Sequence, residues 1–420
     1  MTSEEILQKS KSVERRLIEN GILGRIDDIA MKNQAKVMNA FRNNRVSDSH
    51  FAGTTGYGYD DAGRETIDKI FAEVFEAECA FARHTIASGT HTLAIGLFGL
   101  LRPGDTMLSV TGKPYDTLEE VIGIRGEKGN GSLCDIGVNY KQIDLLPDGE
   151  IDYPAIEKAL EEDKNVKMVF IQRSKGYAIR PTLSAEKIGE IAKFSHERSD
   201  AFVVVDNCYG EFVDEHEPTY YGADMIMGSL IKNPGGGMAE CGGYIAGTEK
   251  AVTLASYRLT CPGIGTESGA SLGHNKNLLK GLFYAPHTVA QALKTAAFAA
   301  EIFSSMGFEV SPTADEVRHD IIQTVSLGTL DRLVAFCEGI QSGAPIDSFV
   351  KPEPSPMPGY AVPVIMAAGA FTQGSSIELS ADAPCKEPYT VYLQGGLTYE
   401  SGKLGILRAA ELVEKAMNNN

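Results

Sequence analysis

The chain has 420 residues, of which 43% are hydrophobic and 23% are charged, proportions typical of a globular protein long enough for two or three domains. Its formal net charge of -17 argues against a nucleic-acid or anionic-membrane partner, because either would require a basic face. The seven cysteines are scattered and odd in number, and no CxxC or HExxH motif offers a metal site. A polar N-terminus and the lack of an apolar run near ~20 residues predict a cytoplasmic protein without a membrane span.

The N-terminal segment has a helical pattern and lacks strand signals. An approximate helical stripe of apolar side chains through residues 5–44 predicts one or two amphipathic helices ahead of the first strand. We therefore expect a helical arm over residues 1–48, packed on another subunit or on a smaller domain.

A loop rich in glycine and tyrosine comes next. Three glycines and two tyrosines, Tyr57 and Tyr59, fall within eight residues. Such a segment is too flexible for a core element and too aromatic for a linker. A tyrosine-rich surface turn is an equally good interpretation of this segment taken alone.

A candidate anion site lies at residues 85–92. Ser88, Gly89 and Thr90 open an apolar helix over residues 93–101, and the free N–H groups of such a helix start attract anions. An ordinary helix cap is the commoner explanation for these residues. Ser229, much later in the chain, is a second hydroxyl that could reach the same anion.

Alternating strands and helices from about residue 85 to 250 predict an α/β fold, with a mostly parallel, doubly wound sheet. Tyr115 lies on a loop after the strand at 106–110, where its ring could stack on a flat cofactor or lie between subunits. We expect a large domain over residues 49–285. A smaller α+β domain over residues 286–420 would contain helices at 287–306, 329–341 and 399–417, with strands at 324–327, 362–370, 376–379 and 390–393.

The residues with the clearest chemical meaning are Asp206 and Lys232. Asp206 ends the apolar run 202–205, which predicts a buried strand with a carboxylate at its tip, where open α/β sheets bind ligands. Lys232 follows Ser229 and precedes three glycines that let the backbone approach a ligand. Together they indicate pyridoxal 5'-phosphate (PLP), which needs an amine for a Schiff base and a carboxylate for its ring nitrogen. Each residue alone would more often be a loop cap or a solvated lysine.

Seven longer motifs stand out in the chain: Gly56-Tyr-Gly-Tyr-Asp-Asp-Ala-Gly-Arg-Glu, Ser88-Gly-Thr-His, Gln172-Arg-Ser-Lys-Gly-Tyr, Val205-Asp-Asn-Cys-Tyr-Gly-Glu, Ser229-Leu-Ile-Lys-Asn-Pro-Gly-Gly, Arg258-Leu-Thr-Cys-Pro-Gly-Ile-Gly and Leu393-Gln-Gly-Gly-Leu-Thr-Tyr. They resemble motifs of fold-type I PLP-dependent enzymes, the aspartate aminotransferase superfamily. Within it, the chain is similar to the aluminium-resistance or methionine γ-lyase-like family, which is related to cystathionine β-lyases.

This resemblance implies a role for each candidate residue. Lys232 would hold the cofactor, Asp206 would pair with its ring nitrogen, and Tyr115 would stack on its ring. The phosphate would lie on Gly89, Thr90 and Ser229 beside Ser88, completed by Tyr57 and Tyr59 of a neighbouring subunit, which implies an obligate dimer and, beyond it, a tetramer. Lys386 stands where the family usually has the arginine that binds the substrate carboxylate. Arg173 and Arg258 are the alternatives.

The resulting hypothesis is a PLP-dependent carbon–sulfur lyase that acts on a sulfur-containing amino acid by β- or γ-elimination. A second hypothesis keeps the cofactor but changes the reaction to aldol cleavage, racemisation or transamination. A third is an oligomeric binding protein that retains PLP, or only the fold, with weak or no turnover; the lysine at position 386 motivates it.

Overall fold

The computed structural model describes residues 3–178, 180–357, 360 and 362–418. These residues form two compact units. The large unit consists of residues 35–230 and 238–283, and the small unit of residues up to 34, 231–237 and from 284 onward. This division differs from the predicted domain boundaries at residues 48 and 285. The first part of the N-terminal arm and the segment around Lys232 both belong to the small unit.

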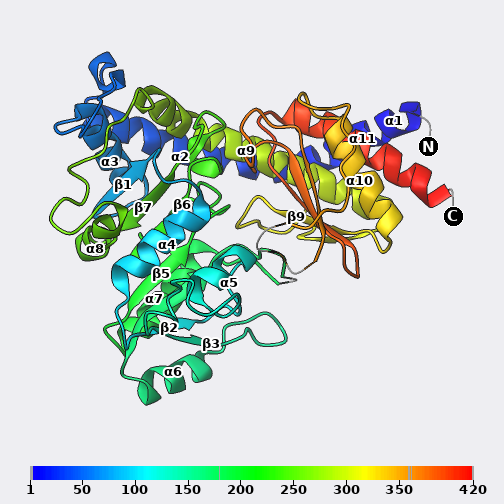
Figure 1. Ribbon diagram of the computed structural model, residues 1–420. Helices are drawn as coiled ribbons and strands as arrows, with labels where there is room; N and C mark the ends of the chain where they lie inside the picture. The colour runs from blue at the N-terminus through cyan, green and yellow to red at the C-terminus, as the bar shows by residue number, and fades with distance from the viewer. Residues whose placement is uncertain (1–2, 179, 358–359, 361, 419–420) are drawn as a thin grey trace. The chain divides into compact units, whose positions relative to one another are not determined.

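A seven-stranded, mostly parallel sheet forms the centre of the large unit, which confirms the predicted α/β fold (Figure 1). β7 is antiparallel to both of its neighbours, and the other strand pairs are parallel. In spatial order the strands are β1 (Cys79–Arg83), β7 (Gly243–Gly247), β6 (Met225–Ser229), β5 (Phe202–Asp206), β4 (Val166–Gln172), β2 (Thr106–Ser109) and β3 (Asn139–Gln142).

The central strands are buried on both faces. β5 and β6 are buried along their whole length, as the continuous apolar run at 202–205 predicts for a strand covered on both sides. The helix α4 packs on β6 and β7 (Figure 1). The helices of this unit are α3 (Ala62–Val74), α4 (Gly89–Leu100), α5 (Asp116–Ile122), α6 (Tyr153–Glu162), α7 (Ala185–His196) and α8 (Glu249–Leu259), with the 3-10 turn η1 (Asp48–Phe51).

Side-chain caps fix where several of these helices begin. Ser88, Asp152, Ser184 and Thr248 each accept a hydrogen bond from the backbone N–H three residues further on. These caps fix the first turn of each helix at the end of the preceding loop.

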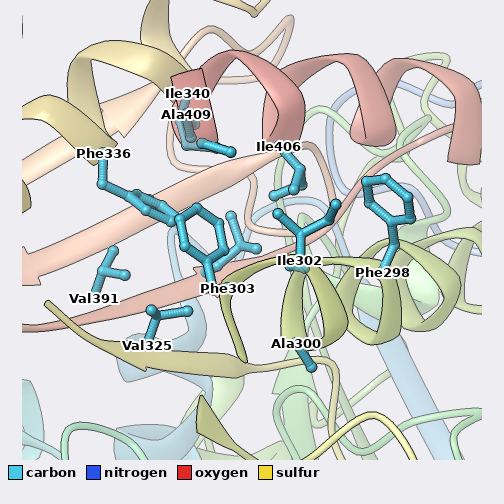
Figure 2. Close-up of a cluster of buried hydrophobic side chains, with 14 of the residues drawn as sticks. Phe298, Ala300, Ile302, Phe303, Val325, Phe336, Ile340, Val391, Ile406 and Ala409 are labelled. Atoms are coloured by element: carbon cyan, nitrogen blue, oxygen red, sulfur yellow. The ribbon is translucent and has the colours of Figure 1, made fainter. Parts of the chain in front are cut away.

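The small unit contains an antiparallel five-stranded sheet and long helices. Phe303 and Phe336 meet in its core, with ring centroids 5.0 Å apart, beside Val325 and Val391 from the sheet (Figure 2). The strands, in spatial order, are β10 (Val364–Ala368), β11 (Ser380–Pro384), β12 (Thr390–Gln394), β9 (Gln323–Ser326) and β8 (Glu309–Ser311). The helices are α1 (Ser3–Glu19), α10 (Leu330–Ser342) and α11 (Tyr399–Asn418), with most of α2 (Ile22–Asn43) and α9 (Asn275–Ser305) and the 3-10 turn η2 (Asn233–Gly235).

Two predicted elements of the C-terminal half are misplaced. The long helix begins at Asn275, twelve residues before the predicted start, and continues through Pro286. The strand expected at 376–379 is instead β11, which begins at Ser380. In the part of the chain that is described, no helix is both long and apolar enough to cross a membrane.

Candidate active site

Asp206 lies at the C-terminal end of β5, between the ends of β4 and β6. It is paired with Gln172 on one side and Met227 on the other, and it is 7% exposed. Its Oδ1 accepts a hydrogen bond from the N–H of Cys208 at 3.1 Å. The chain turns immediately after the strand, so the carboxylate is held at the sheet edge where parallel sheets bind ligands.

The first turn of α4 lies against the ends of β5 and β6. Gly89 has no side chain, and a Cβ there would be 3.4 Å from the Cβ of Ser229 and 3.8 Å from Sγ of Cys208. Thr90 is held by a 2.8 Å hydrogen bond between its hydroxyl and that of Thr117 on α5. The structure therefore brings Gly89, Ser229 and the turn after Asp206 together within the large unit.

The hydroxyl of Ser229 lies where it could donate a hydrogen bond to an anion. The residue is 1% exposed, and its Oγ has no hydrogen-bond partner among the described residues. A buried hydroxyl without a partner is costly, and here it lies beside Gly89, the first residue of α4, whose N-terminus carries a partial positive charge. A phosphate group in this place would accept hydrogen bonds from both. Ser88 has a different role, because its side chain caps the helix by accepting from the N–H of His91 at 3.1 Å.

Tyr115 is half-buried at the start of α5. Its ring meets the ring of Tyr177 edge-on, with centroids 5.7 Å apart and planes at 62°. Gly176 adopts a φ of 56°, and a Cβ there would be 3.3 Å from Cδ2 of Tyr115. The absence of a side chain at 176 thus lets the backbone pack closely against the tyrosine and helps to fix its ring.

Arg173 has no access to a substrate carboxylate, contrary to the role suggested for it. Its side chain is 0% exposed, and its guanidinium donates to Asp214 at 2.6 Å and to Glu217 at 3.3 Å. Burial acts to lower the pKa of Arg173, but Asp214, Glu217 and Glu211 outweigh that effect and raise it. The arginine is a charged part of the protein interior.

The other two candidates for carboxylate binding are exposed. Arg258 lies in the last turn of α8, with its guanidinium 5.1 Å from the ring centroid of Phe98. Phe98 is eight residues beyond Thr90 on α4, which corresponds to about 12 Å along the helix axis. Arg258 therefore contacts the far part of α4 and not its first turn. Lys386 is exposed on the turn that joins β11 to β12 in the small unit.

Tyr57 and Tyr59 lie on the surface of the large unit. They are 74% and 56% exposed, and their rings stack with centroids 5.6 Å apart. The backbone beneath them is firmly held: Arg64 Nη1 donates to the carbonyls of Gly58 and Gly269 at 2.6 and 2.7 Å, and the N–H of Gly269 donates to the Tyr57 carbonyl at 2.8 Å. The two rings therefore lie together on the surface of a loop whose backbone is held by hydrogen bonds.

A buried carboxylate holds this tyrosine loop. Asp61 caps α3 and accepts hydrogen bonds from Thr54, Ser271 and Asn275. Burial alone would raise the pKa of Asp61, but the hydrogen bonds from these side chains and from the N–H of Arg64 outweigh it and lower the pKa from 3.8 to about 2. The loop is therefore most firmly fixed when Asp61 is ionised.

We expect this carboxylate to make stability depend on acid pH. Because the folded-state pKa is the lower one, Asp61 contributes its full stabilisation above about pH 4 and loses it as the pH falls through about 2. Denaturant unfolding between pH 2.5 and 6 should show that Asp61→Asn lowers the free energy of unfolding at about pH 6. Below about pH 4, the free energy of unfolding should change less with pH in the variant than in the wild type. An unchanged slope in the variant would show that Asp61 is not the group responsible.

Lys232 lies in the small unit, three residues after the end of β6. It is half-buried and precedes η2. Its segment is fixed by hydrogen bonds from Ser375 Oγ to the Ile231 carbonyl, 2.9 Å, and from Thr288 Oγ1 to the Gly236 carbonyl, 3.4 Å. Gly236 and Gly237 adopt φ values of 53° and 75°, which explains why glycine follows the lysine.

Sequence reasoning missed the residues that support the site. Thr117 and Tyr177 were not singled out, nor was Asn207, which is 0% exposed behind Asp206. The position of Thr117 in the first turn of the helix after Tyr115 could have identified it as a residue of the site. Tyr177 and Asn207 gave none, because their partners are far away in the sequence. Among the described residues, no group of three or more His, Cys, Asp or Glu could hold a metal ion.

A mostly parallel sheet of this topology, with a buried carboxylate at its C-terminal edge, has the fold of the fold-type I PLP-dependent enzymes. The PLP-dependent protein YhfS of Escherichia coli shares the fold, with a TM-score of 0.61 at 15% identity over 94% of this chain and 97% of that one. The sequence profile of the methionine gamma-lyase family matches residues 6–414, and the chain belongs to that family.

More similar proteins are also known. The uncharacterized protein YnbB of Bacillus subtilis (strain 168) is 48% identical over 419 residues, 99% of each chain. A carbon-sulfur lyase involved in aluminum resistance from Clostridium novyi NT has a TM-score of 0.92 and 50% identity, covering 97% of this chain and 95% of that one. A candidate cystathionine beta-lyase involved in aluminum resistance from Listeria innocua has a TM-score of 0.94 and 52% identity, covering 98% and 100%.

Proposed function

We propose that this protein is a PLP-dependent carbon–sulfur lyase that acts on a sulfur-containing amino acid, such as cystathionine, cysteine or methionine, by β- or γ-elimination. The observation that supports it most is the buried Ser229 hydroxyl, without a partner among the described residues, beside the first turn of α4 and the turn after Asp206. Membership of the methionine gamma-lyase family and the names of the similar structures support the reaction class.

The residues present fit PLP. Gly89, Thr90 and Ser229 would hold its phosphate beside Ser88, Asp206 its ring nitrogen, Tyr115 its ring and Lys232 its aldehyde carbon. When bound, PLP supplies an electron sink for the charge that develops at Cα of the amino acid. Lys232 follows Ser229 by three residues in the sequence, so the lysine and the proposed phosphate-binding hydroxyl belong to one short segment.

The protein's own groups divide the chemistry between them. The Nζ of Lys232 takes the proton from Cα, and the same amine can return a proton later in the reaction. The Asp206 carboxylate keeps a proton on the ring nitrogen, since a buried anion stabilises a cation next to it. Lys386 would bind the substrate carboxylate as a point charge, a weaker and less directional partner than an arginine fork, with Arg258 as the alternative.

A second copy of the chain completes the proposed site. Tyr57, Tyr59 and Leu272 are all more than half exposed on the large unit. We propose that they pack against another subunit in a dimer that can pair into a tetramer, with both tyrosines reaching the partner's phosphate. Light scattering on the purified protein tests the oligomeric state.

The reaction is tested by product identification. Purified protein loaded with PLP should release pyruvate or 2-oxobutyrate from cystathionine, cysteine or methionine. Turnover of another amino acid without these products would support aldol cleavage, racemisation or transamination instead. PLP binding with no turnover of any amino acid would leave the binding-protein hypothesis.

The fit of the phosphate can be tested apart from turnover. Ser229→Ala removes a buried hydroxyl that has no partner among the described residues, so the stability of the cofactor-free protein should stay the same or rise. PLP affinity should fall about tenfold, since about 1.4 kcal/mol of hydrogen bonding to a charged group is lost. Thermal unfolding and fluorescence titration with PLP measure the two effects. Equal PLP affinity in wild type and variant would remove Ser229 from the site.

A further inference from the structure

A buried polar network lies directly behind Asp206. Arg173, the first residue after β4, donates from Nη1 to Oδ1 of Asn207 at 2.7 Å, in addition to its ion pairs with Asp214 and Glu217. Asn207 is the residue after Asp206, and like Arg173 it is 0% exposed. A guanidinium thus bonds to the side chain next in sequence to the carboxylate proposed to face the cofactor.

The network holds Asn207 from several directions. Its Nδ2 donates to Glu217 at 3.0 Å and to the Tyr244 hydroxyl at 3.3 Å, and its backbone N–H donates to the Met227 carbonyl at 2.9 Å. The backbone N–H of Arg173 also donates to the carbonyl of Asp206 at 3.1 Å. Arg173 therefore constrains Asp206 through the main chain and Asn207 through its side chain.

The turn after Asp206 has a backbone that needs such support. Tyr209 and Phe212 adopt φ values of 74° and 63°, which bulky residues rarely do. Gly210 lies against the guanidinium, and a Cβ there would be 2.6 Å from Cζ of Arg173. The N–H of Cys208, in the same turn, donates to the Asp206 carboxylate. A change in the turn would therefore move a hydrogen-bond donor of that carboxylate.

We propose that Arg173 is a positioning residue, which fixes the Asp206 carboxylate for the cofactor's ring nitrogen by holding Asn207 and the turn after it. This inference rests on the proposed PLP site. A lysine could keep the positive charge but not the fork, because one ammonium cannot bond to Asn207, Glu217 and Asp214 in the same planar arrangement. Arg173→Lys thus separates the geometry of the network from its charge.

The experiment compares Arg173→Lys and Asn207→Ala with the wild type and with Arg83→Lys. Arg83 is a matched control, because it is 4% exposed and its fork binds Asp68 on α3 instead of the turn after Asp206. For each protein, PLP affinity is measured by titration of the cofactor-free form. Thermal unfolding of that form and the pH midpoint of the visible absorption band of bound PLP are recorded alongside.

Both network variants should bind PLP at least about tenfold more weakly and move the pH midpoint by about one pH unit. Arg83→Lys should lower the thermal unfolding midpoint about as much as the network variants do. Its PLP affinity should stay within about twofold of the wild type, and the pH midpoint of its absorption band within about 0.2 pH units. If Arg173→Lys does not fold, Asn207→Ala alone tests the proposal. It removes the hydrogen bond between Arg173 and residue 207 but leaves the ion pairs of Arg173 with Asp214 and Glu217 in place. Stability losses with unchanged affinity and midpoint would overturn the proposal, whereas a wild type that binds no PLP would overturn the proposed function instead.

Discussion

Lys232→Ala is expected to lower the rate of product release by on the order of 10³-fold or more, since the variant loses both the amine that holds the cofactor and the base that takes the Cα proton. The fold should survive, because the fixed parts of this segment are backbone carbonyls that bond to Ser375 and Thr288. Turnover of cystathionine and the thermal unfolding midpoint are the two measurements.

A surface lysine provides the control for Lys232. Lys158 is 73% exposed on α6, and Lys158→Ala should leave both turnover and stability unchanged. Borohydride reduction of the wild type followed by peptide mass spectrometry should place the cofactor on the peptide that contains Lys232. Attachment at another lysine, or a Lys232→Ala protein with near wild-type turnover, would contradict the assignment.

The central part of the site could be predicted because its signals are local in the sequence. The apolar run that ends at Asp206 has a strand pattern, and the fold of the large unit confirms the strand. The start of α4 was less clear, because its first turn is polar and the apolar stripe only begins at Leu93. The side chain of Ser88 caps that turn, so the helix begins four residues earlier than the stripe.

Other features depend on contacts that a linear pattern does not contain. Arg173 is an alternative to Lys386 for substrate binding in the sequence, but its side chain is buried against Asn207, Asp214 and Glu217, which come 34 to 44 residues later. In α9, Pro286 lies within a helix whose neighbours Leu282, Ala285 and Val289 are buried. Burial of this apolar face outweighs the helix-breaking tendency of proline, which is why the helix begins twelve residues before the predicted start.

Asp206→Asn should separate charge from shape at the centre of the site. The amide retains an oxygen that can accept from the N–H of Cys208, as Oδ1 does at 3.1 Å, so the turn and the thermal stability should be nearly unchanged. The negative charge is lost, and with it the stabilisation of a proton on the cofactor's ring nitrogen. We expect kcat to fall on the order of 10²- to 10³-fold, the usual cost of losing a preorganised electrostatic contact.

The control for this variant is a carboxylate on the surface. Asp200 is exposed just before β5, and Asp200→Asn should leave kcat unchanged. Steady-state assays at several pH values should show that Asp206→Asn stays impaired throughout, because an amide does not titrate. If Asp206→Asn instead retained wild-type kcat, the carboxylate would have to serve only the turn after β5, and the pairing proposed between Asp206 and the cofactor's ring nitrogen would be wrong.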